Sequence, residues 1–303
     1  MQPADLVAPV LTPWRTGGQL ARASTPGDGT LLRHYGGDWR SILEGTSIGL
    51  LQLMYPPLGT AVATQSGFFD DPFGRIYRSI PQIWATILAP DADIRARRIR
   101  DLHRDIRGVA SGRRFSALEP ETFWWAHATF THLILRSVKR YHRAGDLDDG
   151  GYEHLYADTV GWYERYGVSM RPVPATLQEF RAVFDRFCEE RLELTDAVER
   201  VLQIDRGEAP PGVAGPLDRI TAPIQRRYGR LSTIGNLPPV IRHRLGFDWT
   251  DDDQRRLDRM ATMLRSLFEA MPPAVNRATF QAALRRTGAR TRADRYVPRA
   301  RAA

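Results

Sequence analysis

The amino-acid sequence predicts an all-α protein with a single globular domain of about ten or more helices. Three observations indicate this fold class. Apolar residues recur at helical spacing along most of the chain, no long run alternates apolar with polar residues, and no internal repeat is visible. The chain of 303 residues is long enough to bury a sizeable core. Apolar residues make up 42% and charged residues 26% of the sequence, which is typical of a globular protein.

We expect three parts along the chain. Residues 1–38 are rich in Pro, Gly, Ser and Thr, and they predict an irregular N-terminal arm. Residues 39–286 contain the periodic segments and predict the all-helical domain. Residues 287–303 predict a basic tail that cannot bury a core and that we expect to be disordered.

Prolines and capping residues place the helix boundaries. Pro56-Pro57 separates the first two helical pieces, and Pro120 stands at a favourable first helical position. Thr176 and Thr250 are expected N-caps, and three aspartates after Thr250 suit the positive end of a helix dipole. The expected helices, in order, are 39–54, 58–66, 72–89 with a kink or restart at Pro81, 92–110, 121–143, 151–166, 177–204, about 217–231, 251–270 and 274–286.

The expected helix 121–143 belongs in the middle of the protein. Its first part, ETFWWAHATFTHLIL, is apolar on almost every face. A helix that is apolar all round is buried on all sides, so we expect the other helices to surround this one.

The positive charge lies mainly at the C-terminus. The net charge is +8, and Lys139 is the only lysine among 43 basic residues. Residues 285–303 hold seven arginines and one aspartate, which is +6 of the +8 and leaves about +2 for the rest. We therefore expect a nearly neutral body and no specific nucleic-acid partner.

Cysteine content and hydropathy limit the cell compartments in which we expect the protein. Cys188 is the only cysteine, so no intramolecular disulfide can form. The N-terminus shows no positive segment followed by an apolar run, so we expect no signal peptide. The most apolar segment, 47–63, contains Pro56-Pro57 and predicts a core segment rather than a transmembrane helix. These features predict a cytoplasmic protein whose oligomeric state the sequence leaves open.

The stretch IRARRIRDLHRDIRG (94–108) contains the first candidate site. On a helical wheel its apolar stripe is formed by Ile94, Ile99, Leu102, Ile106 and Val109. His103 lies at the edge of that stripe, with Arg100 at i−3 and Arg107 at i+4 on the same edge. Charge repulsion favours a neutral histidine, which is a good metal ligand, and two arginines suit a pair of carboxylates. A haem supplies both an iron and two propionates. The alternative is a histidine packed at the edge of a core helix and bonded to a carbonyl.

Two further groups are candidates. His127 lies on the apolar Phe123–Phe130 face of the most apolar helix and is either a satisfied core histidine or a ligand. Arg75 and Arg78 point away from the core face of helix 72–89, and Ser79 borders both faces, so on spacing alone these are surface residues. The sequence contains no Gly-rich phosphate loop, HExxH or CxxC motif.

The order of several motifs resembles the mpaB-type oxygenases, a family that includes the latex clearing proteins. The matching segments are LLQLMYPPLGTAVATQSGFFDDPFGRIYRS (50–79), IRDLHRDIRG (99–108), FSALEPETFWWAHATF (115–130) and LPPVIRHRLGFDW (237–249). They extend over about residues 40–265, which is most of the chain.

The resemblance implies a globin-like core that binds haem b. It places the axial iron ligand at His103, with Arg100 and Arg107 beside it. It also implies cofactor-binding roles for the buried His127 and for Arg242, and it places Arg75 and Ser79 near the haem.

Two departures bear on the substrate. Many members of the family have a histidine where this chain has Tyr55, and latex-type members have a lysine where it has Arg78. Because a polymer-cleaving enzyme would also need export, we expect a small apolar intracellular substrate together with O2. The resulting hypothesis is a haem b-dependent oxygenase with Arg75, Arg78 and Ser79 in the oxygen-binding pocket. The alternatives are a haem storage or sensor protein and a cofactor-free helical interaction protein.

Overall fold

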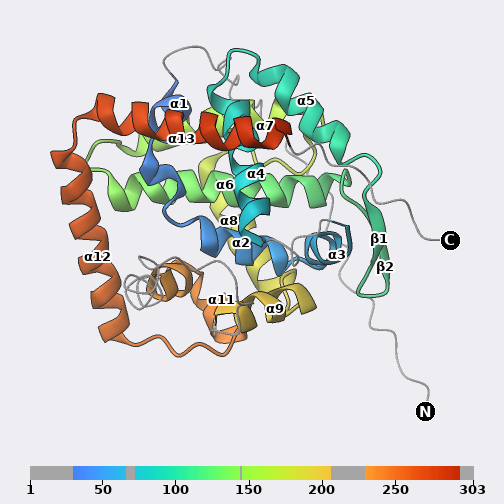
Figure 1. Ribbon diagram of the computed structural model, residues 1–303. Helices are drawn as coiled ribbons and strands as arrows, with labels where there is room; N and C mark the ends of the chain where they lie inside the picture. The colour runs from blue at the N-terminus through green and yellow to red at the C-terminus, as the bar shows by residue number, and fades with distance from the viewer. Residues whose placement is uncertain (1–29, 66–71, 144, 206–228, 294–303) are drawn as a thin grey trace.

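The computed structural model describes residues 30–65, 72–143, 145–205 and 229–293, with side chains in 30–64, 79–143, 145–202 and 229–285. Helices make up most of these residues, and within them one two-stranded antiparallel hairpin is the only sheet (Figure 1). The all-α prediction is confirmed.

Helix α6 (Pro120–Tyr141) crosses the middle of the molecule, as its apolar sequence predicted (Figure 1). It begins with Pro120 in the first turn, and both of its tryptophans are buried. Helices α2 (Gly45–Leu53), α7 (Asp149–Glu164) and α12 (Asp251–Ala270) pack around it, as does the 3-10 helix η1 (Trp39–Ile42).

The other helices follow most of the expected segments. Helix α4 continues through Pro81 without restarting, and Thr250 forms the expected capping box at the start of α12. The remaining helices are α1 (Leu31–Gly36), α3 (Pro56–Gln65), α4 (Pro72–Leu88), α5 (Ala92–Leu102), α8 (Leu177–Glu190), α9 (Asp196–Asp205), α11 (Pro239–Arg244) and α13 (Pro273–Ala293), and residues 229–235 are also helical.

The expected helix 92–110 is wrong in its second half. Helix α5 ends at Leu102, and the hairpin of β1 (Arg107–Ala110) and β2 (Arg113–Ser116) follows. Ser111 and Gly112 form the two-residue turn with φ of 47° and 74°, the positive values that suit a tight hairpin. Gly108 faces Phe115 so closely that a Cβ there would lie 2.9 Å from its ring.

The expected helix 177–204 is two helices. Between α8 and α9 the chain crosses to the end of α2, where the Glu193 amide donates to the Met54 carbonyl (2.9 Å). The Thr195 hydroxyl donates to the Leu53 carbonyl (2.7 Å) and accepts from the Val198 amide (3.3 Å), so it also starts α9. These long-range bonds replace the helical ones, which explains the break.

The expected limits of the helical domain are also too narrow. Thr30 caps α1 inside the expected irregular arm, and α13 continues to Ala293 into the expected tail. The rest of the arm (1–29) and of the tail (294–303) lies outside the described residues, as do residues 217–228 of the helix expected at about 217–231.

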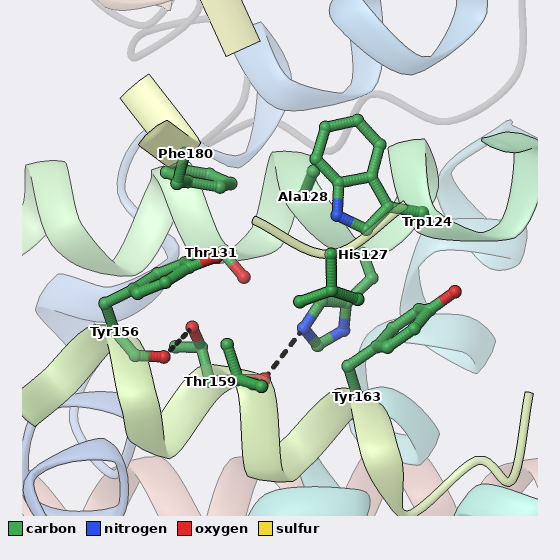
Figure 2. A pocket seen from close by; sticks show the side chains of 10 residues that line it. Trp124, His127, Ala128, Thr131, Tyr156, Thr159, Tyr163 and Phe180 are labelled. Carbon is green, nitrogen blue, oxygen red and sulfur yellow. Dashed lines mark hydrogen bonds between the residues drawn. The ribbon is translucent and has the colours of Figure 1, made fainter. Parts of the chain in front are cut away.

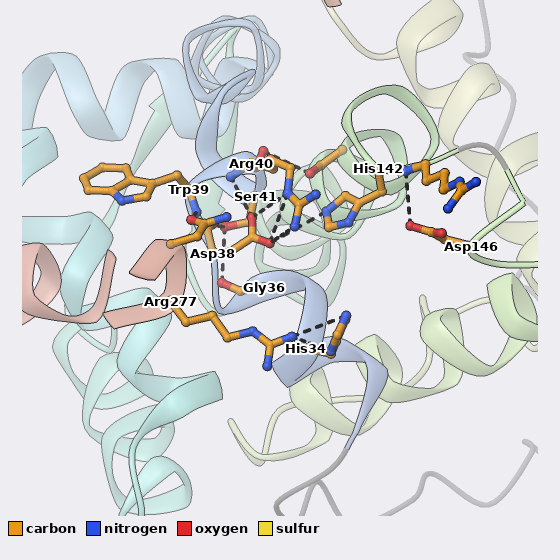
Figure 3. Close-up of polar contacts among 12 residues, drawn as sticks. His34, Gly36, Asp38, Trp39, Arg40, Ser41, His142, Asp146 and Arg277 are labelled. Atoms are coloured by element: carbon orange, nitrogen blue, oxygen red, sulfur yellow. Dashed lines mark hydrogen bonds and ion pairs between the residues drawn. The ribbon is translucent and has the colours of Figure 1, made fainter. Parts of the chain in front are cut away.

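The two ends of the helical domain bind each other directly (Figure 3). The Trp39 amide donates to the Asn276 side chain (3.2 Å), and the Trp39 indole donates to Thr279 (3.1 Å). Arg277 donates to the His34 ring (2.7 Å) (Figure 3). Helix α13 thereby holds α1 and η1 in place on the central helix.

Candidate functional site

His103 lies at the C-cap of α5, half-buried, and its ring bonds to the backbone of its own helix. Its Nδ1 atom is 2.7 Å from the carbonyl oxygen of Ile99. A carbonyl only accepts, so Nδ1 carries the proton, and in the neutral ring Nε2 has the lone pair. Metal-binding histidines commonly have this arrangement, because the second bond fixes the tautomer and the ring orientation. The carbonyl bond also matches the alternative of a packed histidine.

Most of the expected apolar stripe is exposed, and only Ile99 and Ile106 are half-buried. Ile94 and Leu102 are 65% and 64% exposed, whereas Ala92 and Ala96 are buried. The small alanines form the inner face because α5 packs closely on α4. Ile99 and His103 are both half-buried on this inner side, so the inward position predicted for His103 is correct although most of the predicted stripe is exposed.

The two flanking arginines do not share one helix edge with His103. Arg100 is on α5, where its guanidinium pairs with Asp101 (2.9 Å) and reaches the Gly167 carbonyl at 3.5 Å. Arg107 is exposed on strand β1, because the helix ends before it. The predicted trio is therefore wrong as a helical arrangement, and any shared role of the arginines stays a prediction.

Phe123 connects His103 to an aromatic cluster in the core. Its ring centroid lies 6.2 Å from that of His103, edge to face. It also lies 6.1 Å from Tyr163 and 5.3 Å from Tyr166, both at the end of α7. The sequence analysis did not single out either tyrosine, although both lie on the apolar spacing of the segment VGWYERY (160–166).

His127 belongs to the same cluster (Figure 2). It is buried, and its Nε2 atom donates to the Thr159 carbonyl (3.0 Å). Burial lowers the pKa of His127 to about 3, so the ring is neutral. Its ring centroid lies 5.0 Å from that of Tyr163 and 6.2 Å from that of Tyr166. The structure thus brings His103 and His127 to one aromatic cluster, each with an internal carbonyl as partner.

Thr86 fastens α4 to α7 next to this cluster. Its buried hydroxyl accepts from the Trp162 indole (2.7 Å) and bonds to the Tyr166 hydroxyl (3.3 Å). Its carbonyl accepts from Arg165 (2.8 Å). Sequence reasoning missed Thr86, because its local sequence pattern does not predict hydrogen-bond partners on a helix far along the chain.

The three candidates for the oxygen-binding pocket lie on α4, seven to eleven residues before Thr86. Ser79 is half-buried there, on the helix that packs against α5. The side chains of Arg75 and Arg78 lie outside the described residues. Their roles stay predictions.

Arg242 does not join this group. It lies on α11, where it donates to the Gly235 carbonyl (3.1 Å) and stacks over Trp249 at 5.0 Å. Helix α11 packs against α8, away from α5 (Figure 1). Its neighbour Arg244 donates to the Cys188, Glu189 and Leu192 carbonyls and so caps α8. A cofactor-binding role for Arg242 stays a prediction that the described contacts do not support.

His103 suits a haem as an iron ligand, whereas the cavity beside His127 is too small for a haem. His103 has the donor and tautomer that a haem iron needs. The cavity beside His127 has a volume of about 10 Å³, room for about one water, so it cannot accept a haem.

Comparison with known proteins identifies the family. Residues 33–266 match the model of the catalytic domain described as "ER-bound oxygenase mpaB/B'/Rubber oxygenase". The chain belongs to this family. The match to the mpaB/rubber oxygenase domain begins within α1 and ends within α12. Its presence confirms the resemblance drawn from the spaced motifs and supports an oxygenase-type enzyme.

Two mycobacterial relatives are similar over most of their length. They are uncharacterized proteins of Mycobacterium tuberculosis and Mycobacterium bovis, each 22% identical over 232 residues, or 74% of this chain and 87% of the relative. No solved structure matches this member of the mpaB/rubber oxygenase family. Among the described helices, none is long and apolar enough to cross a membrane.

Proposed function

We propose that this protein is a haem b-dependent oxygenase and that Nε2 of His103 binds the haem iron. The observation that carries the proposal is the bond from His103 Nδ1 to the Ile99 carbonyl, within a family of oxygenases. That bond keeps the proton on Nδ1, so in the neutral ring the lone pair is on Nε2, the atom that can bind a metal. When bound, a haem supplies the site at which O2 is activated.

The protein's own part is to orient the ring and keep water away. The Ile99 carbonyl holds the imidazole at the end of α5, and the edge of Phe123 supports it from α6. Tyr163 and Tyr166 extend this apolar wall. A wall of aromatic rings suits the small apolar intracellular substrate expected from the sequence.

Helix α4 completes the proposed site. The bonds of Thr86 to Trp162 and Arg165, which we call the Thr86 clamp, fix the second half of α4 against α7. The first half contains Arg75, Arg78 and Ser79, which we propose belong to the pocket that would admit oxygen. Polar donors fixed in advance stabilise the charge that develops on oxygen without reorganising.

An absorption spectrum of the protein from haem-replete cells tests the ligand. We expect a Soret band, and His103→Ala should lose the haem or change its spin state. The matched control is His154→Ala, because His154 lies on α7 with a side chain 58% exposed. In His103→Gly, added imidazole should restore the wild-type spectrum.

The outcomes separate the alternatives. A wild-type protein without a Soret band, even after haem addition, contradicts the proposal and favours the cofactor-free interaction protein. A spectrum unchanged in His103→Ala but changed in His127→Ala contradicts the ligand assignment. Haem binding without substrate-dependent O2 uptake favours the storage or sensor protein over the oxygenase.

A further inference from the structure

Helix α5 has its large apolar side chains on the outside. Ile94 and Leu102 are 65% and 64% exposed, whereas the small Ala92 and Ala96 face the core. Val109, on strand β1 shortly after the helix, is 59% exposed. Among the described residues, these are the three most exposed of the large apolar side chains. A helix face that meets only water is normally polar, so this face indicates contact with an apolar partner.

Arginines alternate with these apolar side chains. Arg98 lies between Ile94 and Leu102 at helical spacing, so the three residues share the outer face of α5. Val109 pairs across the hairpin with Arg114, which is also exposed. The guanidinium groups of Arg98 and Arg114 form no hydrogen bond or ion pair with other residues that the structure describes. Helix α5 and the hairpin follow one another along one edge of the molecule (Figure 1), and we call residues 92–116 the basic edge.

Outside the C-terminal segment, the positive charge of the chain is concentrated in the basic edge. The edge contains eight arginines and three aspartates, which is a net charge of +5. Residues 285–303 hold +6 of the total of +8, so the remaining residues, 1–91 and 117–284, carry −3. A positive edge on a body of the opposite charge suits a partner that presents many negative charges.

The chemistry of the basic edge fits the surface of an anionic bilayer. Lipid phosphates attract arginines, while apolar side chains enter the boundary between headgroups and acyl chains. A nucleic acid would bind the arginines through its phosphates but leave Ile94 and Leu102 in water. A second copy of the chain would bring arginines against arginines. A bilayer with anionic lipids satisfies both kinds of side chain.

We infer that the basic edge binds the anionic surface of a phospholipid bilayer. Ile94 and Leu102 enter the headgroup region, and Arg98 and Arg114 bind lipid phosphates. The binding depends only on the basic edge, while its use in catalysis rests on the proposed function. Since His103 directly follows Leu102, docking brings the proposed iron ligand close to a phase in which small apolar substrates dissolve.

Sedimentation with vesicles tests the binding. We expect the full chain to bind vesicles of phosphatidylcholine with phosphatidylglycerol, to ignore phosphatidylcholine alone, and to dissociate as salt increases. Ile94→Ser should weaken the binding about tenfold and Arg98→Gln about fivefold. The matched controls are Met263→Ser, at a side chain 57% exposed, and Arg259→Gln. Both lie on α12, on the opposite side of the molecule from α5 (Figure 1), and should bind like the wild type.

A fluorescent label measures entry into the bilayer directly. Cys188 is fully buried, so a thiol dye that responds to polarity labels the cysteine introduced by Ile94→Cys. We expect its emission to shift to the blue with the anionic vesicles. The same dye at Met263→Cys should show no shift. A dye at position 94 that stays in water while the protein binds would contradict the inference.

The remaining outcomes are equally decisive. Vesicle binding that survives Ile94→Ser and Arg98→Gln belongs to another basic segment, such as 285–303, and overturns the inference. Tight binding to a DNA duplex that Ile94→Ser leaves unchanged, without vesicle binding, favours a nucleic-acid surface and overturns it too. A protein that binds the vesicles through the basic edge but never takes up haem contradicts the proposed function alone. A haem-loaded oxygenase that ignores the vesicles contradicts the bilayer alone.

Discussion

His103 donates a hydrogen bond from Nδ1 to the carbonyl of Ile99, 2.7 Å away and one helical turn earlier. His127 uses its other nitrogen, Nε2, to donate to the Thr159 carbonyl at 3.0 Å. The two candidate histidines therefore have opposite tautomers in their neutral forms. Each tautomer is enforced by an acceptor that cannot donate.

Long-range proton–nitrogen NMR spectra of the haem-free protein test this assignment. We expect the proton on Nδ1 in His103 and on Nε2 in His127. The signals are assigned with His103→Ala and His127→Phe. The same tautomer in both rings would contradict the geometry on which the proposed iron ligand depends.

The pH dependence of stability follows from three histidines whose pKa values are lowered in the folded protein. Burial lowers the pKa of His127 and His132 to about 3, and burial followed by the charge of Arg40 lowers that of His142 to about 4. In the unfolded chain these three histidines bind protons near pH 6.5, whereas in the folded protein they stay neutral at that pH. Stability is therefore lost as pH falls from 6.5 to 5, by up to about 1.4 kcal/mol per pH unit for each histidine.

Urea unfolding at several pH values, compared with His132→Phe, measures this effect. The His132 ring stacks on Phe184 at 4.1 Å, and its Nε2 atom is buried without a partner. The phenylalanine keeps the stacking and removes the titration. We expect equal or higher stability at pH 7 and a shallower pH dependence, whereas an unchanged slope would contradict the buried neutral state.

The Thr86 clamp should be a large contributor to stability for one hydroxyl. Thr86→Val leaves the Trp162 indole and the Tyr166 hydroxyl without their shared partner. We expect a loss of about 1–3 kcal/mol in the free energy of unfolding. Thr262→Val is the control, since that hydroxyl is exposed and bonds only within α12. Equal effects of the two substitutions would contradict the clamp.

Cys188 should be unreactive in the folded protein. Its side chain is fully buried, and burial raises the pKa of the thiol. A thiol reagent such as DTNB should react about a thousandfold or more slowly than in urea, because the reaction requires unfolding. The exposed control is a cysteine introduced by Thr262→Cys. Rapid labelling of Cys188 without denaturant would contradict its burial.

Local signals predicted the fold where local physics decides it. The cap at Thr250 and the aspartates after it set the start of α12 at the expected residue, and the apolar run of α6 placed that helix in the centre. The expected helix 177–204 failed because Glu193 and Thr195 bond to the distant end of α2. The strands beside the Ser111-Gly112 turn have four residues each and are too short to show an alternating pattern, so the hairpin was missed.

The predictions about the candidate site were also correct only where local helical spacing decides the position of a residue. The inward position of His103 and the burial of His127 followed from helical spacing and are correct. The helical trio with Arg100 and Arg107 failed because spacing arguments hold only while the helix continues. The Thr86–Tyr166 contact joins residues 80 apart, so it depends on how α4 packs on α7 rather than on any local pattern.

The bonds between Trp39 and α13 have a consequence for synthesis on the ribosome. The Trp39 and Asn276 partners are 237 positions apart. Until α13 emerges, α1 and η1 lack their cover, so these two helices must wait for a segment that is made much later. Chains of this size commonly pass through intermediates that expose apolar surface. The nascent protein therefore remains open to chaperones until α13 has left the ribosome.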